Sequence, residues 1–283
     1  MQVTHFQAME ARPENKNLAI VSGVVRRASF AEYSWAGLKV LPQMIAAVRS
    51  DAEGLAIAKA YCLVDKDGLL QGDEKPLELK GGTKTSVRIL GFRHDELAAG
   101  GIAGISLEFA NVSATHRMNP SPINVGGWEK SEMRSWLNED YFAKLPDDLR
   151  PLVEPAWKLT NNVGRVRKEN DVSVVRRNAD GPDRLWLLSL SEVYGSFSSK
   201  DEDKLWSPST YDAEGAQYQL YESKEVSTTS YSFCKKDGAY SLWWLRSLLV
   251  GNSNSFHCVY RDGGWDGWIF ADRGWGVSPG FCF

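Results

Sequence analysis

The spacing of hydrophobic residues predicts helices in the first quarter of the chain. Over residues 30–61 apolar positions recur every three or four residues, which places them on one face of an amphipathic helix: Leu38, Leu41, Ile45 and Val48. Pro42 falls early enough to start this helix or to kink it. An alanine-rich piece over residues 52–61 predicts a second helix. Residues 1–28 predict an extended segment, either an arm that docks on another subunit or a strand of the same sheet.

Alternating polar and apolar positions predict a β-hairpin over residues 75–92. Gly81 and Gly82 separate its two alternating runs, and such a pair is typical of a tight turn. The next residues, 93–127, predict a long irregular connection that is interrupted by one β-like segment, Ile105–Phe109.

The rest of the chain combines further helices, strands and long loops. Residues 128–142 have the period of a helix, and residues 146–153 and 191–195 predict shorter helical pieces. We expect residues 196–241 to form long ordered loops with short strands, because so long a stretch is rarely an idle connection in a compact domain. Strands are expected at five further places: residues 156–160, 184–190, 243–247, 256–260 and 276–283. These elements together predict an α+β protein.

Residues 243–283 differ in composition from the rest of the chain. They contain no Lys and no Glu, and short polar residues and Arg alternate with aromatic residues. Rigid aromatic side chains beside short polar ones are typical of antibody binding loops. Within residues 264–275 four of the twelve residues are aromatic and strand alternation is weak, so we expect these four to face solvent at a binding site: Trp265, Trp268, Phe270 and Trp275.

Charge and hydropathy exclude several classes of protein. The 283 residues carry a net charge of −3, so no basic excess draws the chain to nucleic acid or to an anionic membrane. No apolar run approaches the roughly 18 residues that a membrane helix needs. The first residues lack the basic-then-apolar pattern of a secretory signal. If the protein works outside a cell, we expect it to leave by another route, for example as part of a virus particle.

The cysteines and histidines form no recognisable chemical motif. The four cysteines make no CxxC pair and have no His at zinc spacing: Cys62, Cys234, Cys258 and Cys282. We expect buried, reduced thiols, and a disulfide between Cys258 and Cys282 is the alternative that spacing alone cannot establish. The four histidines are scattered, and no Ser-His-Asp order, Walker loop or HExxH motif occurs.

Several motifs in order resemble a known family: GGWEKSEMRSWLNEDYF (126–142), RLWLLSLSEVYG (184–195), WWLRS (243–247) and GVSPGFCF (276–283). This family is common in gut bacteria and their phages, and its C-terminal domain has the C-type lectin fold, related in architecture to formylglycine-generating-enzyme domains. SWAGL (34–38) and VRILGFRHDELA (87–98) are similar to the same family. Its members are frequent targets of diversity-generating retroelements, which rewrite a C-terminal variable region by adenine-directed mutagenesis while the fold stays constant.

The resemblance implies ligand binding, whereas the motifs of the related catalytic and calcium-binding proteins do not occur. A calcium-dependent lectin uses a Glu/Gln-Pro-Asn/Asp tripeptide and a nearby Trp-Asn-Asp, and neither occurs here. A formylglycine-generating enzyme needs a redox-active cysteine pair that binds copper, and Cys258 and Cys282 lack the surrounding pattern. We therefore expect no enzyme activity, no metal and no cofactor.

The C-terminal segment is expected to contain two interleaved sets of residues. One is a buried frame: Trp243, Trp244, Leu245, Phe256, Val259, Val277, Pro279 and Phe281. Arg246 is expected to be a structural donor that pins a loop. The other set is expected to contact the ligand: Asn252, Asn254, His257, Tyr260, Arg261, Asp262, Trp265, Asp266, Trp268, Phe270, Asp272, Arg273 and Trp275.

Two parts of the chain are therefore expected. Residues 1–70 would form a small α/β module, a strand arm with helices and an assembly role, and residues 71–283 an α+β ligand-binding domain with the C-type lectin fold and a variable region at 248–275. The expected ligand is a protein or glycan on a cell surface, with virion partners for the module. The expected location is a virion or cell surface, or alternatively the cytoplasm. Two other functions stay open: a structural virion or tail component with these aromatics in a subunit interface, and a carbohydrate-binding lectin of fixed specificity.

Overall fold

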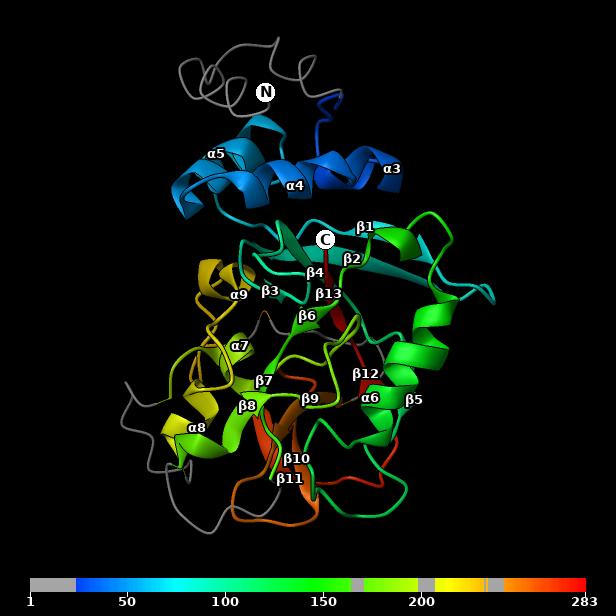
Figure 1. Ribbon diagram of the computed structural model, residues 1–283, viewed down its shortest axis with the longest axis vertical. Coiled ribbons are helices and arrows are strands. Elements are labelled where there is room, and N and C mark those ends of the chain that lie inside the picture. Colours follow the sequence, from blue (N-terminus) through cyan, green and yellow to red (C-terminus); the bar gives the residue numbers. More distant parts are fainter. Residues whose placement is uncertain (1–23, 164–170, 198–206, 232, 234–241) are drawn as a thin grey trace.

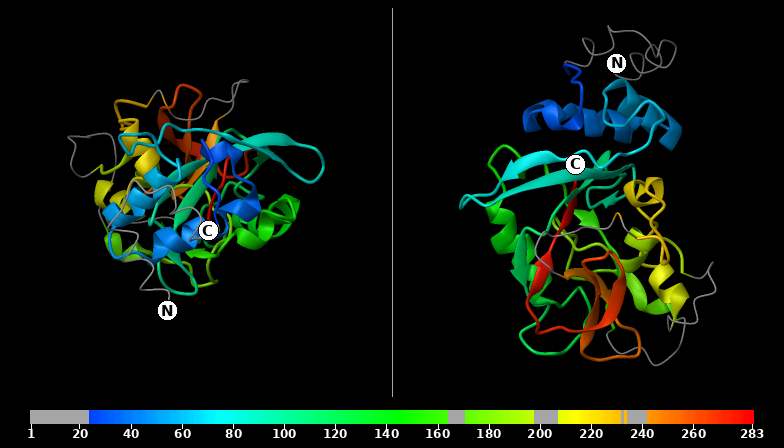
Figure 2. Two further views of the ribbon diagram at one scale, coloured as in Figure 1. Left: turned by 90° about the horizontal axis from the view of Figure 1, so that it is seen from above. Right: turned by 180° about the vertical axis from the view of Figure 1, so that it is seen from behind.

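A computed structural model describes residues 24–163, 171–197, 207–231, 233 and 242–283. Helices and strands each make up 25% of the structure, which confirms the α+β class. Figures 1 and 2 show a helical layer at one end, a first sheet beside it and a second sheet towards the opposite end. The strand expected before Phe30 falls mostly on residues outside the described ranges, and the regular elements described within residues 24–70 are helices.

Short helices form the N-terminal layer: η1 (Phe30–Glu32), α3 (Trp35–Leu38), α4 (Val40–Ala47) and α5 (Asp51–Ala60). The side chains of Ser34 and Ser50 cap α3 and α5 by accepting hydrogen bonds from the backbone N–H groups of Gly37 and Glu53. Pro42 lies in the first turn of α4, where a missing N–H leaves no helical hydrogen bond unmade. The helical prediction is confirmed, and the caps explain where it is interrupted.

The first sheet has the strand order β1-β2-β4-β13, and every neighbouring pair is antiparallel. Its strands are β1 (Lys75–Glu78), β2 (Lys84–Phe92), β4 (Ile105–Phe109) and β13 (Gly280–Cys282). The expected hairpin and the expected strand at residues 105–109 are both confirmed. Because β13 pairs with β4, the end of the chain lies against its first half.

Gly104, the residue before β4, packs against the backbone of the helical layer. A Cβ atom on Gly104 would be 1.9 Å from the backbone oxygen of Pro42 in α4. Glycine is therefore required for this close approach of the two layers. The two layers also share one hydrophobic core, which includes residues of the helices and of both large sheets.

The second sheet has the order β11-β10-β9-β12-β5, with β11 at its edge. Its strands are β9 (Trp243–Leu248), β10 (Ser255–Val259), β11 (Trp265–Phe270), β12 (Trp275–Val277) and β5 (Ala114–His116). The pair β9–β12 is parallel and the other pairs are antiparallel. The strand β11 corrects the expectation of weak strand character over residues 264–275.

Smaller elements connect the two large sheets. Two short strand pairs are β3 (Glu96–Leu97) with β6 (Ala156–Trp157) and β7 (Leu159–Asn161) with β8 (Val175–Arg177). The helical elements are α6 (Glu132–Trp136), the π-helical turn η2 (Leu137–Tyr141), η3 (Phe142–Lys144), η4 (Arg150–Leu152), η5 (Val172–Val174), α7 (Leu190–Tyr194), α8 (Pro208–Asp212) and α9 (Gln219–Ser223).

Three predicted elements differ in detail. The helix expected from Trp128 begins at Glu132, because Ser131 caps it by accepting from the N–H of Arg134. Residues 184–190 are not a regular strand, since only the isolated bridge between Trp186 and Gly280 pairs this run. The described part of 196–241 contains the helices α8 and α9 where short strands were expected.

We expect Gly104→Ala to destabilise the protein, because the new methyl group collides with the backbone of α4. Overpacking of this kind lowers the free energy of unfolding by about 1–3 kcal/mol. Gly274→Ala is the matched control, since its Cβ would lie 3.5 Å from Thr115 Cγ2, an ordinary contact. Urea unfolding of both variants measures the difference, and equal stability of Gly104→Ala and the wild type would contradict the close packing of the two layers.

Candidate functional site

The expected frame of the C-terminal segment is buried throughout. All eight frame residues are buried: Trp243, Trp244, Leu245, Phe256, Val259, Val277, Pro279 and Phe281. Seven lie on strands β9, β10, β12 and β13, and Pro279 lies between the last two. The expectation that these eight residues are buried is therefore confirmed.

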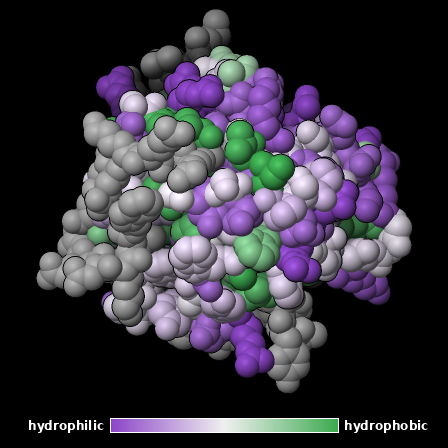
Figure 3. All heavy atoms as spheres, turned by 90° about the horizontal axis from the view of Figure 1, so that it is seen from below, coloured by the Kyte–Doolittle hydropathy of each residue, from purple (hydrophilic) through white to green (hydrophobic). Residues whose placement is uncertain are grey.

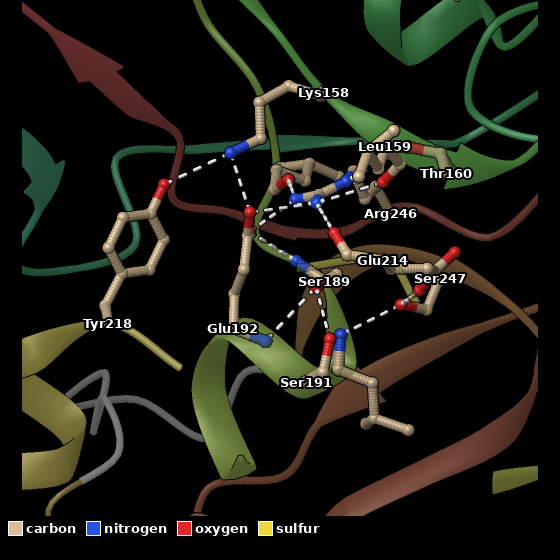
Figure 4. A network of polar contacts seen from close by, with 12 residues as sticks. Lys158, Leu159, Thr160, Ser189, Ser191, Glu192, Glu214, Tyr218, Arg246 and Ser247 are labelled. Atoms are coloured by element: carbon tan, nitrogen blue, oxygen red, sulfur yellow. Dashed lines mark hydrogen bonds and ion pairs between the residues drawn. The ribbon is translucent and has the colours of Figure 1, made fainter. Parts of the chain in front are cut away.

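Arg246 of β9 lies at the centre of a buried polar network (Figure 4). Its guanidinium donates two hydrogen bonds to the carboxylate of Glu192, one of 2.9 Å, and one of 2.9 Å to the backbone oxygen of Glu214. It also donates to the backbone oxygen of Leu187 (2.9 Å) and to the hydroxyl of Thr160 (3.1 Å). An unpaired buried N–H group costs free energy, so these partners fix the arginine. Arg246 is thus a structural donor, as expected, and it joins four separate segments.

Lys158 extends this network towards the first sheet. Its Nζ lies 2.6 Å from Oε1 of Glu192 and 2.7 Å from Oδ1 of Asp95, and the hydroxyl of Tyr218 donates to Asp95 over 3.0 Å. Burial opposes ionisation of Glu192, but Arg246 and Lys158 outweigh it and lower the pKa of this carboxyl to about 2. Two cations therefore keep a fully buried carboxylate charged.

Glu214 has the opposite pKa shift within the same network. One of its carboxyl oxygens accepts a hydrogen bond of 3.0 Å from the backbone N–H of Asn161, and the hydroxyl of Ser247 donates to the other. Burial raises the pKa of Glu214 to about 7, although Arg246 acts against the rise. All of these side chains are buried, so the network supports the fold and offers no reactive group to solvent.

The loops of the C-terminal segment are held through their main chain. Asn124 is buried, and its side-chain amide donates to the backbone oxygens of Asn252 (3.1 Å) and Ser255 (2.8 Å). The hydroxyl of Tyr194 donates to the backbone oxygen of Gly263 over 2.6 Å, in the turn between β10 and β11. The backbone N–H of Asn119 donates to the oxygen of Ala271 over 2.9 Å, after β11. None of these bonds depends on the identity of a loop side chain.

The thirteen residues expected to contact ligand fall into three groups by exposure. Five are exposed: Arg261, Asp262, Trp268, Phe270 and Arg273. Seven are half-buried: Asn252, Asn254, Tyr260, Trp265, Asp266, Asp272 and Trp275. Trp268 is 70% exposed and Phe270 is 44% exposed, and both lie on the edge strand β11. Exposed aromatic side chains of this size are typical of binding surfaces.

His257 is the one member of this set that is fully buried, which corrects the expectation that it faces solvent. It lies on β10, between β9 and β11, and its Nε2 is 3.0 Å from the hydroxyl of Tyr211. Burial lowers its pKa to about 3, so the ring is neutral. Trp265 packs edge-on against Phe197, with ring centres 5.8 Å apart, and so has a partly structural role.

Three polar members of the set also bond to backbone N–H groups close by in sequence. The side chain of Asn252 accepts from the N–H of Asn254 over 2.7 Å, and that of Asp262 accepts from the N–H of Gly264 over 2.9 Å. Asp266 accepts from the N–H of Trp268 over 2.9 Å. Bonds of this kind to a residue two positions ahead are local and are common for Asn and Asp in turns.

The sequence did not indicate that the loop of residues 119–127 reaches the same surface. Ile123 and Val125 are 49% and 61% exposed, and they flank the buried Asn124 that holds the C-terminal loop. Figure 3 shows this end of the molecule, where apolar residues lie among polar ones. The only local signal is a pair of apolar residues in a turn rich in Pro, Ser and Gly, and its tertiary partner is more than a hundred residues away.

The cysteines are free thiols wherever the structure describes them. Cys258 and Cys282 are buried and unpaired with each other, which excludes the alternative disulfide, and Cys234 lies outside the described residues. Burial raises the pKa of both buried thiols. The described residues contain no group of three or more His, Cys, Asp or Glu side chains that could hold a metal ion. Within the same ranges, no helix is both long and apolar enough to cross a membrane.

We expect Glu214→Gln to remove a pH-dependent loss of stability. The folded-state pKa of about 7 lies above the usual value of 4.5, so the folded protein retains a proton that the unfolded chain has released. The contribution of this group to stability is complete below the usual Glu pKa and is lost as the pH rises through 7, a change of roughly 3 kcal/mol. Glutamine keeps the shape and hydrogen bonds of the neutral carboxyl without titrating.

Urea unfolding from about pH 5 to about pH 8 checks this prediction. The stability difference between Glu214→Gln and the wild type should move in favour of the variant as the pH rises. Asp147→Asn is the control, because the exposed Asp147 carboxyl has a lowered pKa next to Lys80 and does not titrate in this range. A difference for Glu214→Gln that is constant with pH would show that Glu214 is ionised in the folded protein.

Comparison with known proteins identifies one family. No curated protein and no solved structure matches the chain. A profile of the family described as Domain of unknown function (DUF6273) matches residues 106–283, from the second residue of β4 to the end of the second sheet and β13. This match includes Arg246, Asn124 and all thirteen expected contact residues, and it covers more than half of the chain. The chain therefore belongs to the DUF6273 family.

Proposed function

We propose that this protein is a non-enzymatic ligand-binding protein that displays a diversified C-terminal surface on a C-type lectin scaffold. The surface consists of the exposed and half-buried residues of the expected contact set, centred on β11. Its ligand is a protein or glycan on a cell surface, met by a phage particle or presented by a bacterium. The variable region spans residues 248–275, and it is the target of a diversity-generating retroelement.

One observation carries this proposal: residues outside the variable region bind the main chain of the loops. Asn124, Tyr194 and Asn119 bond the backbone around Asn252, Gly263 and Ala271. Side chains on the loops can therefore change without loss of these three bonds, whereas the local bonds that Asn252, Asp262 and Asp266 accept would change with their side chains. A scaffold that tolerates diversification requires this separation.

The motifs that carry the family resemblance support the C-type lectin assignment, because each of the four contains residues of a regular element outside β11. Residues 126–142 include α6, residues 184–195 lead into α7, residues 243–247 lie on β9 and residues 276–283 include β13. Glu192 from the second motif and Arg246 from the third form the central buried ion pair. The second and third motifs are thus physically coupled to each other.

The exposed aromatic side chains supply the binding energy in this proposal. Burying one such side chain in a partner contributes about 1.5–3 kcal/mol. Arg273 and Asp262 are exposed near the two ends of β11, where charged groups add specificity more than affinity.

We expect replacement of Trp268 and Phe270 by Ser to abolish binding without weakening the fold. Both side chains are exposed, and exposed substitutions change stability by about 0.5 kcal/mol or less. Fluorescently labelled protein is incubated with a panel of intact gut bacterial strains, and bound protein is measured by flow cytometry. The wild type should bind at least one strain saturably, and the double variant should not.

Val172→Ser is the matched control, because it removes an exposed apolar side chain elsewhere on the surface. It should bind as the wild type does. Wild-type-like binding by the Trp268 and Phe270 double variant, or binding to no strain, counts against the proposed function.

Diversification has its own test in the DNA next to the gene. A near-copy of the segment that encodes residues 248–275, differing mainly at adenines and lying beside a reverse transcriptase gene, is expected there.

A further inference from the structure

Two exposed aliphatic residues lie on a loop that contacts the proposed variable region but is not part of it. Ile123 and Val125 project from the loop between β5 and α6, and each is about half exposed or more. Asn124 between them is fully buried, so the two neighbours are presented outwards in a fixed way. Single exposed apolar residues are common, but these two flank a buried anchor that is bonded to the backbone oxygen of Ser255, the strand partner of Phe270.

Hydrogen bonds tie this loop to the end of β11. The backbone N–H of Asn124 donates to the backbone oxygen of Ser253 over 3.0 Å. The backbone N–H of Ala271, next to Phe270, donates to the backbone oxygen of Asn254 over 2.9 Å. Within the loop, the side chain of Asn119 donates to the oxygen of Ile123 over 2.5 Å. The loop is therefore organised before any partner arrives, which reduces the entropy lost on binding.

We infer that Ile123 and Val125 form a constant apolar centre beside Phe270 and Trp268, and that this combined surface takes a protein partner. The inference rests on the proposed function and narrows its ligand to one class. Branched aliphatic side chains offer a sugar neither a flat face for stacking nor a hydrogen bond. They do fit apolar side chains of a protein, and an apolar centre with a polar, charged rim is the usual anatomy of a protein interface.

A second copy of this chain fits the surface poorly because of its charges. Arg-Asp and Asp-Arg pairs precede and follow β11 in mirror order: the exposed Arg261 and Asp262, then the half-buried Asp272 and the exposed Arg273. In an antiparallel contact between two copies centred on Gly267, Arg would face Arg and Asp would face Asp. Like charges in direct contact oppose association. The side chain of Asp266 also occupies the N–H of Trp268 on the edge strand. In this register the charges therefore disfavour a second copy, and a different protein is the occupant that we infer.

Methyl NMR of the whole chain tests the class of ligand without the natural partner. The probes are isobutanol and indole, which resemble apolar protein side chains, and N-acetylglucosamine and maltose. Isobutanol and indole should shift the methyl signals of Ile123 and Val125 saturably, and the sugars should leave them in place. The exposed Val25 and Val172 are internal controls and should not respond. Saturable shifts with a sugar, or equal shifts at the control residues, would overturn the inference.

The second arm uses a bacterial strain bound through Trp268 and Phe270. Replacement of Ile123 and Val125 by Ser should weaken binding about tenfold or more, the ratio that corresponds to about 1.4 kcal/mol. Proteinase K treatment of the cells should abolish binding, and periodate oxidation of their glycans should not. Binding that requires Trp268 but is unchanged by the Ile123 and Val125 replacements refutes the inference alone. Binding that does not require Trp268 refutes the proposed function itself.

Discussion

Arg246 and Glu192 form a fully buried ion pair, and each side chain depends on the other to keep its charge in a site shielded from solvent. Loss of one partner of such a pair leaves an uncompensated charge and costs about 3–5 kcal/mol, a large part of the roughly 5–15 kcal/mol by which domains are stable. The pair joins β9 to the capped helix α7, and Lys158 connects the same carboxylate to Asp95 near the first sheet. The two large sheets are thus linked by charge as well as by apolar packing.

The buried network and the proposed binding surface lie on different strands of the second sheet. Arg246 is buried on β9, whereas Trp268 and Phe270 are exposed on the edge strand β11. In the proposal, stability and ligand contact therefore depend on different side chains of the C-terminal segment. His257 marks the boundary between the two roles, because it looks like a contact residue in sequence but packs against Tyr211 as part of the frame.

Local sequence patterns predict a helix or strand correctly where its hydrophobic residues repeat with the period of that element. The stripe through Leu38 and Ile45 and the strand at residues 105–109 are examples. Strand β11 was missed because aromatic residues occupy both of its faces and hide the alternation. Residues 184–190 look like a strand, but main-chain partners at Gly280 and Arg246 hold the run in an irregular path. The neighbourhood of Ile123 depends on contacts across more than a hundred residues, and no local pattern carries that information.

The pairing of β13 with β4 makes folding of the first sheet depend on the last residues of the chain. Residues 248–275 end at the first residue of β12 and precede β13. Phe281 and Phe283 pack into the core, where Phe283 also contacts Trp35 of the helical layer. Under the proposed diversification, a stop codon in the rewritten segment would remove β13, the edge strand of the first sheet. The truncated chain would then lack Phe281 and Phe283, which pack into the core. We expect such a chain not to fold, so a surface would be displayed only by chains that include β13.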